Sequence, residues 1–296
     1  DLLLNSIGAA GNINAANNHS KYRYTALFGR LNYNWKEKYI VNLSARRDGS
    51  SRFGPGKQFA NFGAAGAAWI FSSEPFIQKS LKFLSFGKMR ASYGVTGNDQ
   101  IGNYRFLDLW NSTILPYQEM SALEPISLFN PGYEWEINKK SEVGLELGFV
   151  KDRILFTVSY YRNRSSNQLI NYLLPDQTGF TTITKNLPAL VQNSGMEITF
   201  SSKNVQSKNF KWVTNFTITV PKNKLVSFPG LAGSSYANLY KEGEPLSVYS
   251  GYRYTGVDPA SGIYTFEDID KDGQITFPND YSFLGDTDPK IFGGLQ

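Results

Sequence analysis

An acidic run near the C-terminus has the residue types and the spacing of a metal site. It contains three aspartates at alternate positions and a glycine: Asp268, Asp270, Asp272 and Gly273. These are positions 1, 3, 5 and 6 of a calcium loop, where a hard cation relieves the repulsion among carboxylates. Gln274 at position 7 would bind through its backbone carbonyl, but position 12 is Asn279 and the next acid is Asp280. We expect a structural Ca²⁺ bound by the three aspartates, Gln274 and Asp280; the alternative is an acidic surface turn without metal.

Large aromatic residues stand between the regular patterns of the chain. Four of them are candidates for substrate contact: Trp110, Tyr117, Tyr133 and Tyr172. Aromatic rings combine a large apolar surface with specific stacking geometry, and they are enriched at interfaces. We expect them to stack on sugar rings or pack against a partner protein; the alternative is that they pack the loops against one another.

A basic motif, RRDGSSRF, covers residues 46–53. Alternation places Arg46 on the polar face of its strand, and Asp48 can pair with an arginine there. Together with Arg52, these residues are predicted to form a structural motif at the rim of a sheet, because ion pairs near a surface are common and weak. The alternative is that the motif contacts substrate or another domain of the protein.

The composition of the 296 residues excludes several classes of protein. Without cysteine the chain has no disulfides, thiolate metal sites or thiol catalysis, and a single histidine, His19, cannot build a triad or a metal cluster. The basic residues behind the net charge of +5 are dispersed, which gives little support to nucleic-acid binding. Scattered acids do not define a glycosidase pair, so no enzyme is expected. No apolar run reaches the length of about 18 residues that indicates a transmembrane helix.

Strict alternation of apolar and polar residues predicts β-strands with one apolar face. The clearest case is residues 21–53, where two alternating arms join at a charged turn, residues 36–38. In the first arm Leu31 belongs to the apolar series, and Asn32 lies on the opposite face. Two alternating arms joined by a short turn predict a hairpin.

The same pattern recurs along the chain. Further strands are predicted at 61–71 and 88–96, and further hairpins turn at 151–153 and at 204–209. Segments 263–266 and 275–277 could pair as short strands on either side of the acidic run, and the last residues, IFGGLQ, resemble the start of a strand. In segment 73–86 a short helix is predicted, with Ser73 as N-cap and Pro75 at its start.

The lengths of the arms and of the connections favour a membrane barrel. The arms span about nine to twelve residues, and a tilted strand needs about 9–11 to cross a bilayer. Short turns alternate with long connections, roughly 97–133 and 165–193. Outer-membrane barrels have this asymmetry, with short periplasmic turns and long extracellular loops. We therefore expect an all-β chain that forms part of an antiparallel transmembrane β-barrel; the alternative is a soluble sandwich.

Several segments also resemble a known family. They cover residues 27–74, 88–104, 138–170, 193–200 and 252–296, and they include the runs LFGRLNYNWKEKYIVNLSARRDGSSRF, KMRASYGVTGNDQIGNY, SEVGLELGFVKDRILFTVSYYRNR and NSGMEITF. These segments resemble the barrel of SusC/RagA-type TonB-dependent outer-membrane transporters of Bacteroidetes. Members of this family have a barrel of about 22 strands, and the patterns of this sequence account for about eight to ten of them. Residues 1–296 would therefore be part of one β-barrel domain, without its plug domain and its last strands.

The resemblance implies active import at the bacterial outer membrane. The cargo would be oligosaccharides or peptides, the TonB complex would supply energy through the plug, and a SusD-like surface lipoprotein would be the partner, with outer-membrane lipid around the barrel. Two other classes stay open: a passive porin or adhesin barrel, and a secreted calcium-dependent carbohydrate-binding β-protein. A plug and a TonB box upstream would distinguish an importer from a porin. The sequence does not decide between glycan and peptide.

Overall fold

The computed structural model describes residues 19–112, 120 and 122–296, and this part of the chain forms one large antiparallel sheet and three small ribbons. The strands of the large sheet are β1 (Tyr24–Trp35), β2 (Tyr39–Ser50), β3 (Phe59–Trp69), β4 (Leu84–Asn98), β7 (Glu136–Phe149), β8 (Ile154–Leu173), β9 (Thr182–Gln206), β10 (Lys211–Ser227) and β15 (Phe292–Leu295). The ribbons pair β5 (Leu109–Ser112) with β6 (Leu123–Ser127), β11 (Val248–Tyr252) with β14 (Tyr281–Asp286), and β12 (Tyr254–Val257) with β13 (Tyr264–Phe266). The helical elements are η3 (Phe71–Ser73), α1 (Pro75–Ser80), η4 (Asp176–Thr178) and η5 (Leu231–Gly233).

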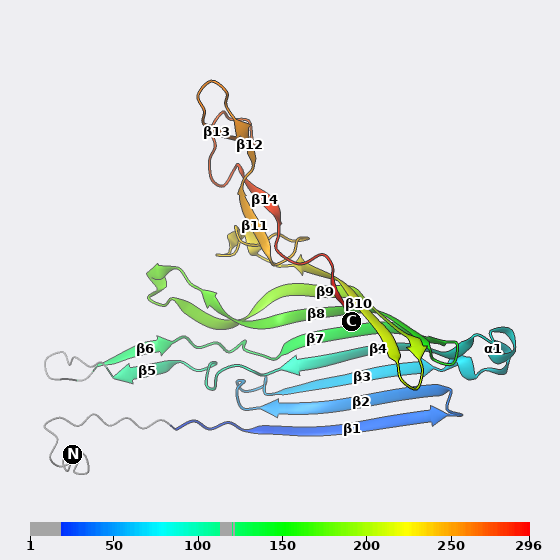
Figure 1. The fold of residues 1–296 in the computed structure, drawn as a ribbon. Coiled ribbons are helices and arrows are strands. Elements are labelled where there is room, and N and C mark those ends of the chain that lie inside the picture. The colour runs from blue at the N-terminus through cyan, green and yellow to red at the C-terminus, as the bar shows by residue number, and fades with distance from the viewer. Residues whose placement is uncertain (1–18, 113–119, 121) are drawn as a thin grey trace, which may run out of the picture.

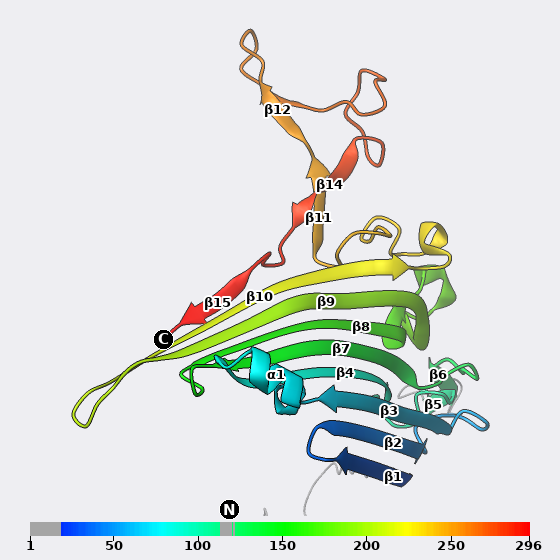
Figure 2. The same ribbon diagram turned by 90° about the vertical axis from the view of Figure 1, so that its right-hand side faces the viewer.

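The large sheet follows the order of the chain. Its nine described strands run in the order β1-β2-β3-β4-β7-β8-β9-β10-β15. Figure 1 shows them side by side from β1 at one edge to β10 near the other, and Figure 2 shows that the sheet curves. The predicted all-β, antiparallel fold is confirmed, and the strand number agrees with the eight to ten expected from the sequence.

The register between strands gathers the apolar residues on one face of the sheet, here called the apolar face. Leu31 lies opposite Leu43 on the next strand, and further along the sheet Leu145 lies opposite Val158, which lies opposite Ile198. Many large side chains of this face are exposed to solvent among the described residues; Leu31, for example, is 60% exposed. The opposite, polar face carries the charged and hydroxylated residues, as alternation predicts.

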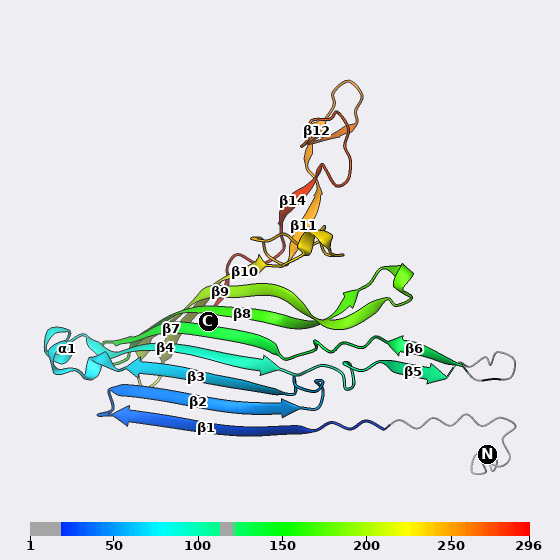
Figure 3. The ribbon, with the colours of Figure 1, turned by 180° about the vertical axis from the view of Figure 1, so that it is seen from behind.

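The short turns lie together at one end of the sheet, where Figure 3 also places α1. Lys36 and Glu37 make the first turn with positive φ angles of 53° and 55°. The second turn is at 150–153, and the third is closed by a hydrogen bond of 2.9 Å from the Ser207 N–H to the Phe210 carbonyl. No helix among the described residues is long and apolar enough to cross a membrane.

The long connection predicted at 165–193 is wrong. Strand β8 continues to Leu173 and β9 begins at Thr182, so the two strands form one extended hairpin around residues 174–181. A small core stabilises this extension, and its buried members are Leu187, Ala189, Val191, Leu225 and Phe228. The connection at 97–133 also contains structure of its own, the β5–β6 ribbon.

Helix α1 begins at Pro75, as predicted, but Ser73 is not its N-cap. Glu74 occupies that position and makes no side-chain capping bond to the helix. Its carboxylate instead accepts hydrogen bonds from Lys38 Nζ (3.1 Å), the Tyr39 hydroxyl (2.7 Å) and Trp69 Nε1 (3.3 Å). The bond from Tyr39, followed by that from Lys38, lowers the pKa of Glu74.

The segment between β10 and β15 leaves the sheet as an arm, which rises past β10 in Figures 1 and 2. The predicted pairing of 263–266 with 275–277 is wrong, because β13 pairs with β12, where Tyr264 lies opposite Val257. After the arm the chain returns to the sheet, and Gly293 of β15 lies opposite Ile218 of β10. This return confirms the strand expected at IFGGLQ.

Candidate functional site

The polar face carries a group of paired charges on β4 and β7. Arg90 Nε donates to Glu146 Oε1 at 3.1 Å, and its Nη1 donates to Glu142. Lys88 Nζ also binds Glu146, at 3.2 Å. Gly144 lies between the two glutamates, and a β-carbon there would stand 2.9 Å from Arg90 Nε. Glycine therefore lets the guanidinium lie against β7 and reach both carboxylates, and the four charges neutralise one another.

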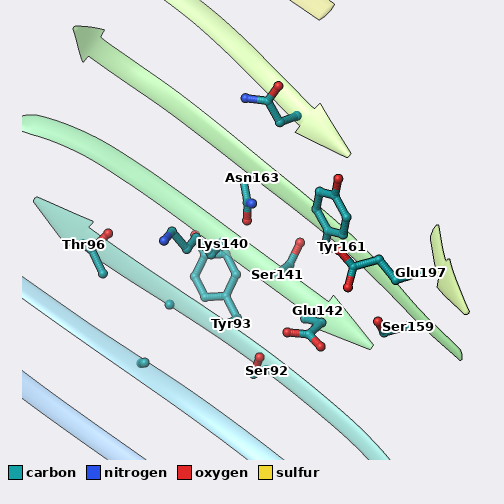
Figure 4. Close-up of a pocket in the computed structure, with 13 residues that line it drawn as sticks. Ser92, Tyr93, Thr96, Lys140, Ser141, Glu142, Ser159, Tyr161, Asn163 and Glu197 are labelled. Atoms are coloured by element: carbon teal, nitrogen blue, oxygen red, sulfur yellow. The ribbon is translucent and has the colours of Figure 1, made fainter. Parts of the chain in front are cut away.

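Beside these pairs, on the side away from the short turns, lies an open hollow of about 730 Å³, which Figure 4 shows. The side chains that give it its polar character are Ser92, Thr96, Lys140, Glu142, Ser159, Tyr161, Asn163, Asn193 and Glu197. They come from β4, β7, β8 and β9, and the register sets them abreast: Lys140 lies opposite Asn163, which lies opposite Asn193. Four strands therefore contribute to one surface.

Most of these polar groups are free to bind a ligand. Within the described residues, no hydrogen bond or ion pair engages the side chains of Ser92, Lys140, Asn163 or Glu197. Asn193 is an exception, since its Oδ1 accepts a hydrogen bond of 2.7 Å from Asn223 Nδ2. The hollow thus offers hydroxyl, amide, ammonium and carboxylate groups together, which suits the binding of a polar molecule.

In the sequence, Glu142 and Glu146 alternate with Val143, Leu145 and Leu147, which predicts that they lie on the polar face, but the sequence does not predict the hollow. Alternation shows which face a residue occupies, but it does not show which residues of different strands stand side by side. That depends on register, which partner strands and turns set together.

The rim motif divides into two sets of contacts. Arg46 Nε donates to Asp48, and Arg46 Nη2 donates to the Tyr24 hydroxyl, while Asp48 itself is buried. Arg52 points elsewhere and donates from Nη1 to the Asp99 backbone carbonyl at 2.7 Å. These partners all belong to strand ends or the adjoining loops, so each contact holds the rim together.

Asp99 is the centre of the second set. Its Oδ2 accepts hydrogen bonds from the Tyr22 hydroxyl at 2.7 Å and from Ser50 Oγ at 2.8 Å. The Arg52 guanidinium lies 4.3 Å from the centre of the Tyr22 ring, within the range of a cation–π interaction. The network fastens the segment before β1 and the end of β2 to the end of β4.

Burial excludes Tyr133 from the predicted set of substrate contacts. Its side chain is fully buried, with its ring centre 5.7 Å from that of Phe53, and Trp135 completes the cluster. The same burial raises the pKa of Tyr133 far above its ordinary value. A ring enclosed in this way packs the loop onto the sheet.

The other predicted aromatics differ in exposure. Trp110 on β5 is 53% exposed, and Tyr117 lies outside the described residues. Tyr172 on β8 packs edge-on against Tyr236, with ring centres 5.4 Å apart, and Lys185 Nζ lies 3.4 Å from the centre of its ring. Of the set, Trp110 offers the most open ring among the described residues.

The acidic loop brings three carboxylates together. Oxygens of Asp268, Asp270 and Asp280 all lie within 4.8 Å of one another. Asp272 is outside this group, and its carboxylate accepts a hydrogen bond of 2.7 Å from the Gln274 N–H. The carboxylate that lies one residue late in the sequence therefore joins the cluster, and the third aspartate of the run does not.

Backbone groups hold the members of this cluster. Asp268 accepts hydrogen bonds from backbone N–H groups, and the bond from Gly273, at 2.8 Å, is the main cause of its lowered pKa. Asp280 is fully buried and accepts bonds from the N–H groups of Ile269 (2.7 Å) and Thr276 (2.8 Å). These bonds help to close the loop around Asp280, as does the bond of 2.7 Å from Asn279 Nδ2 to Asp270 Oδ2.

Comparison with known proteins points to one family. Residues 2–285 match the family described as TonB dependent receptor-like, beta-barrel. TonB-dependent receptor P39 of Formosa agariphila is 34% identical over 234 residues, which are 79% of this chain and 22% of that protein. TonB-dependent receptor SusC of Bacteroides thetaiotaomicron is 30% identical over 216 residues, which are 71% of this chain and 21% of that protein.

A solved structure matches the fold over almost the whole chain. The structure of the RagAB peptide transporter superposes with a TM-score of 0.81 at 25% identity, and the match covers 93% of this chain and 31% of that one. The chain spans about a fifth to a third of the length of these relatives.

Proposed function

Because the chain belongs to the β-barrel family of TonB-dependent receptors, a family of outer-membrane proteins, we propose that the protein it forms part of imports nutrients across that membrane. The cargo is an oligosaccharide or a peptide that is bound and moved along the polar face. The family is one of receptors and transporters, and the proposal accordingly requires no catalytic residue.

The observation that carries this proposal is the division of the sheet into two faces. Its apolar face is continuous and exposed, as contact with lipid requires, and its polar face holds paired charges and a polar hollow. A strand that is apolar on one side and wet on the other is the unit of a membrane barrel with a polar interior. The polar interior supplies the path for a hydrophilic cargo.

We propose further that import is energised by the TonB complex acting on a plug domain, and that a SusD-like lipoprotein closes the outer end. The family match supports the energy source, and the likeness to a structure described as a peptide transporter supports active uptake. A passive porin or an adhesin barrel is the competing function.

Uptake by cells distinguishes these functions. Cells carrying the full-length protein and its lipoprotein partner should take up a fluorescent peptide or oligosaccharide mixture, and loss of the TonB complex or addition of a protonophore should abolish that uptake. A porin would continue to admit the mixture without energy. An adhesin would bind cells or surfaces and admit none of it.

We also propose that the acidic loop binds Ca²⁺ as a structural ion. Asp268, Asp270 and Asp280 would be the principal ligands, with Asp272 and the Gln274 carbonyl nearby. An extracellular site of this kind needs an affinity of only about 10⁻⁴–10⁻³ M. Millimolar Ca²⁺ should protect residues 263–280 of the full-length protein from limited proteolysis, and Asp270→Asn should remove the protection. Equal cleavage with and without Ca²⁺ would leave only an acidic turn.

A further inference from the structure

The hollow on the polar face contains two unpaired charges of opposite sign. Lys140 of β7 and Glu197 of β9 both line it, and neither forms an ion pair with any described residue. The neighbouring charges differ, because Arg90 is fully engaged by Glu142 and Glu146. The hollow therefore has a local positive end and a local negative end, although the paired charges beside it cancel.

The register fixes the separation of these two ends. Lys140 is level with Asn163 and Asn193, and Glu197 lies four positions further along β9. Two strand spacings of about 4.8 Å and a rise of about 3.4 Å per residue put the two α-carbons about 17 Å apart. An extended chain covers about 3.3–3.6 Å per residue, so about four to five residues span that distance.

The groups between the two charges suit a peptide backbone. Figure 4 shows Tyr161 between Lys140 and Glu197, with Asn163 beside Lys140 and Ser159 beside Glu197, as the register also sets them. An amide side chain both donates and accepts hydrogen bonds, and so does a hydroxyl. A peptide backbone needs both kinds of partner, because each residue presents one N–H and one carbonyl.

We propose that the hollow binds a short zwitterionic peptide in extended form, with its C-terminal carboxylate on the Lys140 ammonium and its N-terminal ammonium on the Glu197 carboxylate. A neutral oligosaccharide would also meet the amide and hydroxyl groups, but it would give neither charge a partner. The inference rests on the proposed import function, for which it names the class of cargo.

Binding to the purified full-length transporter tests the assignment. The probe is a library of pentapeptides with uncharged side chains, prepared with free termini, with an amidated C-terminus or with an acetylated N-terminus, and calorimetry measures affinity. Each cap should weaken binding by about tenfold, the factor provided by one charge-assisted hydrogen bond of ordinary strength. In Lys140→Gln the C-terminal cap should have no further effect, and in Glu197→Gln the N-terminal cap should have none.

A matched control separates these contacts from general effects on the sheet. Lys139 is the neighbour of Lys140 on β7 and lies on the other face, opposite Arg164 of β8. Lys139→Gln should retain the full effect of both caps. A loss of the cap effects in this variant would mean that they do not report on the hollow.

Two results would overturn the proposal. One is equal binding of free and capped peptides, or no binding of either, which would mean that other parts of the protein satisfy the two charges. The other is binding of maltopentaose that both Lys140→Gln and Glu197→Gln weaken. Energy-dependent uptake of some other cargo by cells would still uphold the import function, whereas the absence of any such uptake would contradict both proposals.

Discussion

At the rim of the sheet, the degree of burial of a side chain decides whether it can bind a ligand or only packs the fold. Tyr133 illustrates this, because its hydroxyl is buried without a hydrogen-bond partner among the described residues. Tyr133→Phe should therefore leave the free energy of unfolding unchanged or raise it by up to about 1 kcal/mol. Tyr133→Ala should lower it by about 3–5 kcal/mol by opening a cavity. Urea unfolding in detergent measures both values.

The control for this pair is Trp135, a second buried aromatic of the same cluster whose Nε1 donates to the Gln58 carbonyl at 3.1 Å. Trp135→Phe removes a bond that is made, so it should destabilise the protein where Tyr133→Phe does not. A loss of more than about 1 kcal/mol in Tyr133→Phe would indicate that its hydroxyl has a partner in the complete protein.

The sequence could identify residue types at the rim but not their surroundings. Arg46 and Asp48 stand two positions apart on one strand, so their pairing could be expected from local geometry. Tyr133 lies outside the alternating segments, and this position predicts contact with substrate. Its burial depends on Phe53, which is 80 positions earlier in the sequence, and no local pattern reports such a contact.

Among elements, the alternating hairpins were the most predictable from sequence, and the β8–β9 extension was not. A strand with one apolar and one polar side has a signature of period two, as in residues 27–35. Beyond the membrane span, both faces of the extension take part in packing or meet solvent, and Pro188 interrupts the pattern. Without alternation, the sequence of this extension predicts a loop where the structure has a hairpin.

If the apolar face of the sheet meets lipid, a charge on that face of strand β1 should cost more stability than a charge on the polar face. Leu31→Arg places a charge on the apolar face near the middle of the strand and should cost about 2–4 kcal/mol of barrel stability. Asn32→Arg, one residue further on the polar face, should cost clearly less. Unfolding of the full-length protein from lipid vesicles measures the two costs. Equal losses would contradict the assignment of one face to lipid, and a larger loss in Asn32→Arg would reverse that assignment.

The contacts of Glu74 at the junction between β2, β3 and α1 predict how the stability of the folded protein depends on pH. Glu74 has a lowered pKa in the folded protein, because the Tyr39 hydroxyl and then Lys38 favour its ionised form. Its contribution to stability is therefore complete above the ordinary glutamate value of about 4.3, and it is lost as the pH falls through the folded value. Between pH 6 and a more acidic pH of about 3, the wild-type protein should lose more stability than Glu74→Gln.

Thermal unfolding of both proteins across this pH range provides the comparison. Glu124→Gln is a suitable control, since Glu124 is an exposed glutamate on β6, outside this junction. If wild type and Glu74→Gln lose stability in parallel on acidification, the carboxylate of Glu74 does not hold this junction.

For the whole molecule, the turns and the extended hairpins should face opposite compartments. The chain has no cysteine, so single engineered cysteines report their own position. In intact cells an impermeant maleimide should label Gln177→Cys, in the turn between β8 and β9, but not Lys208→Cys, in the turn between β9 and β10. Lysis should make both reactive. Labelling of Lys208→Cys alone before lysis would reverse the topology.

The choice of sites follows from the structure. Gly54 lies in the loop between β2 and β3, but a β-carbon there would stand 3.2 Å from the Phe106 ring, so a cysteine at that position would be shielded. Gln177 and Lys208 are both exposed.

The late return of β15 to β10 has a consequence for the order in which the sheet assembles. Strands such as β1 and β2, or β9 and β10, are joined by tight turns. Each of these pairs can form its hydrogen bonds as soon as both strands have been made and have reached the membrane. Strand β15 meets β10 only after the whole of residues 228–291 has been made. Closing so long a loop costs more chain entropy, and non-local pairings form more slowly. The edge of β10 that pairs with β15 therefore stays unpaired for longer than the edges of strands joined by tight turns, and it is an edge at which a second, unfinished chain could add by mistake.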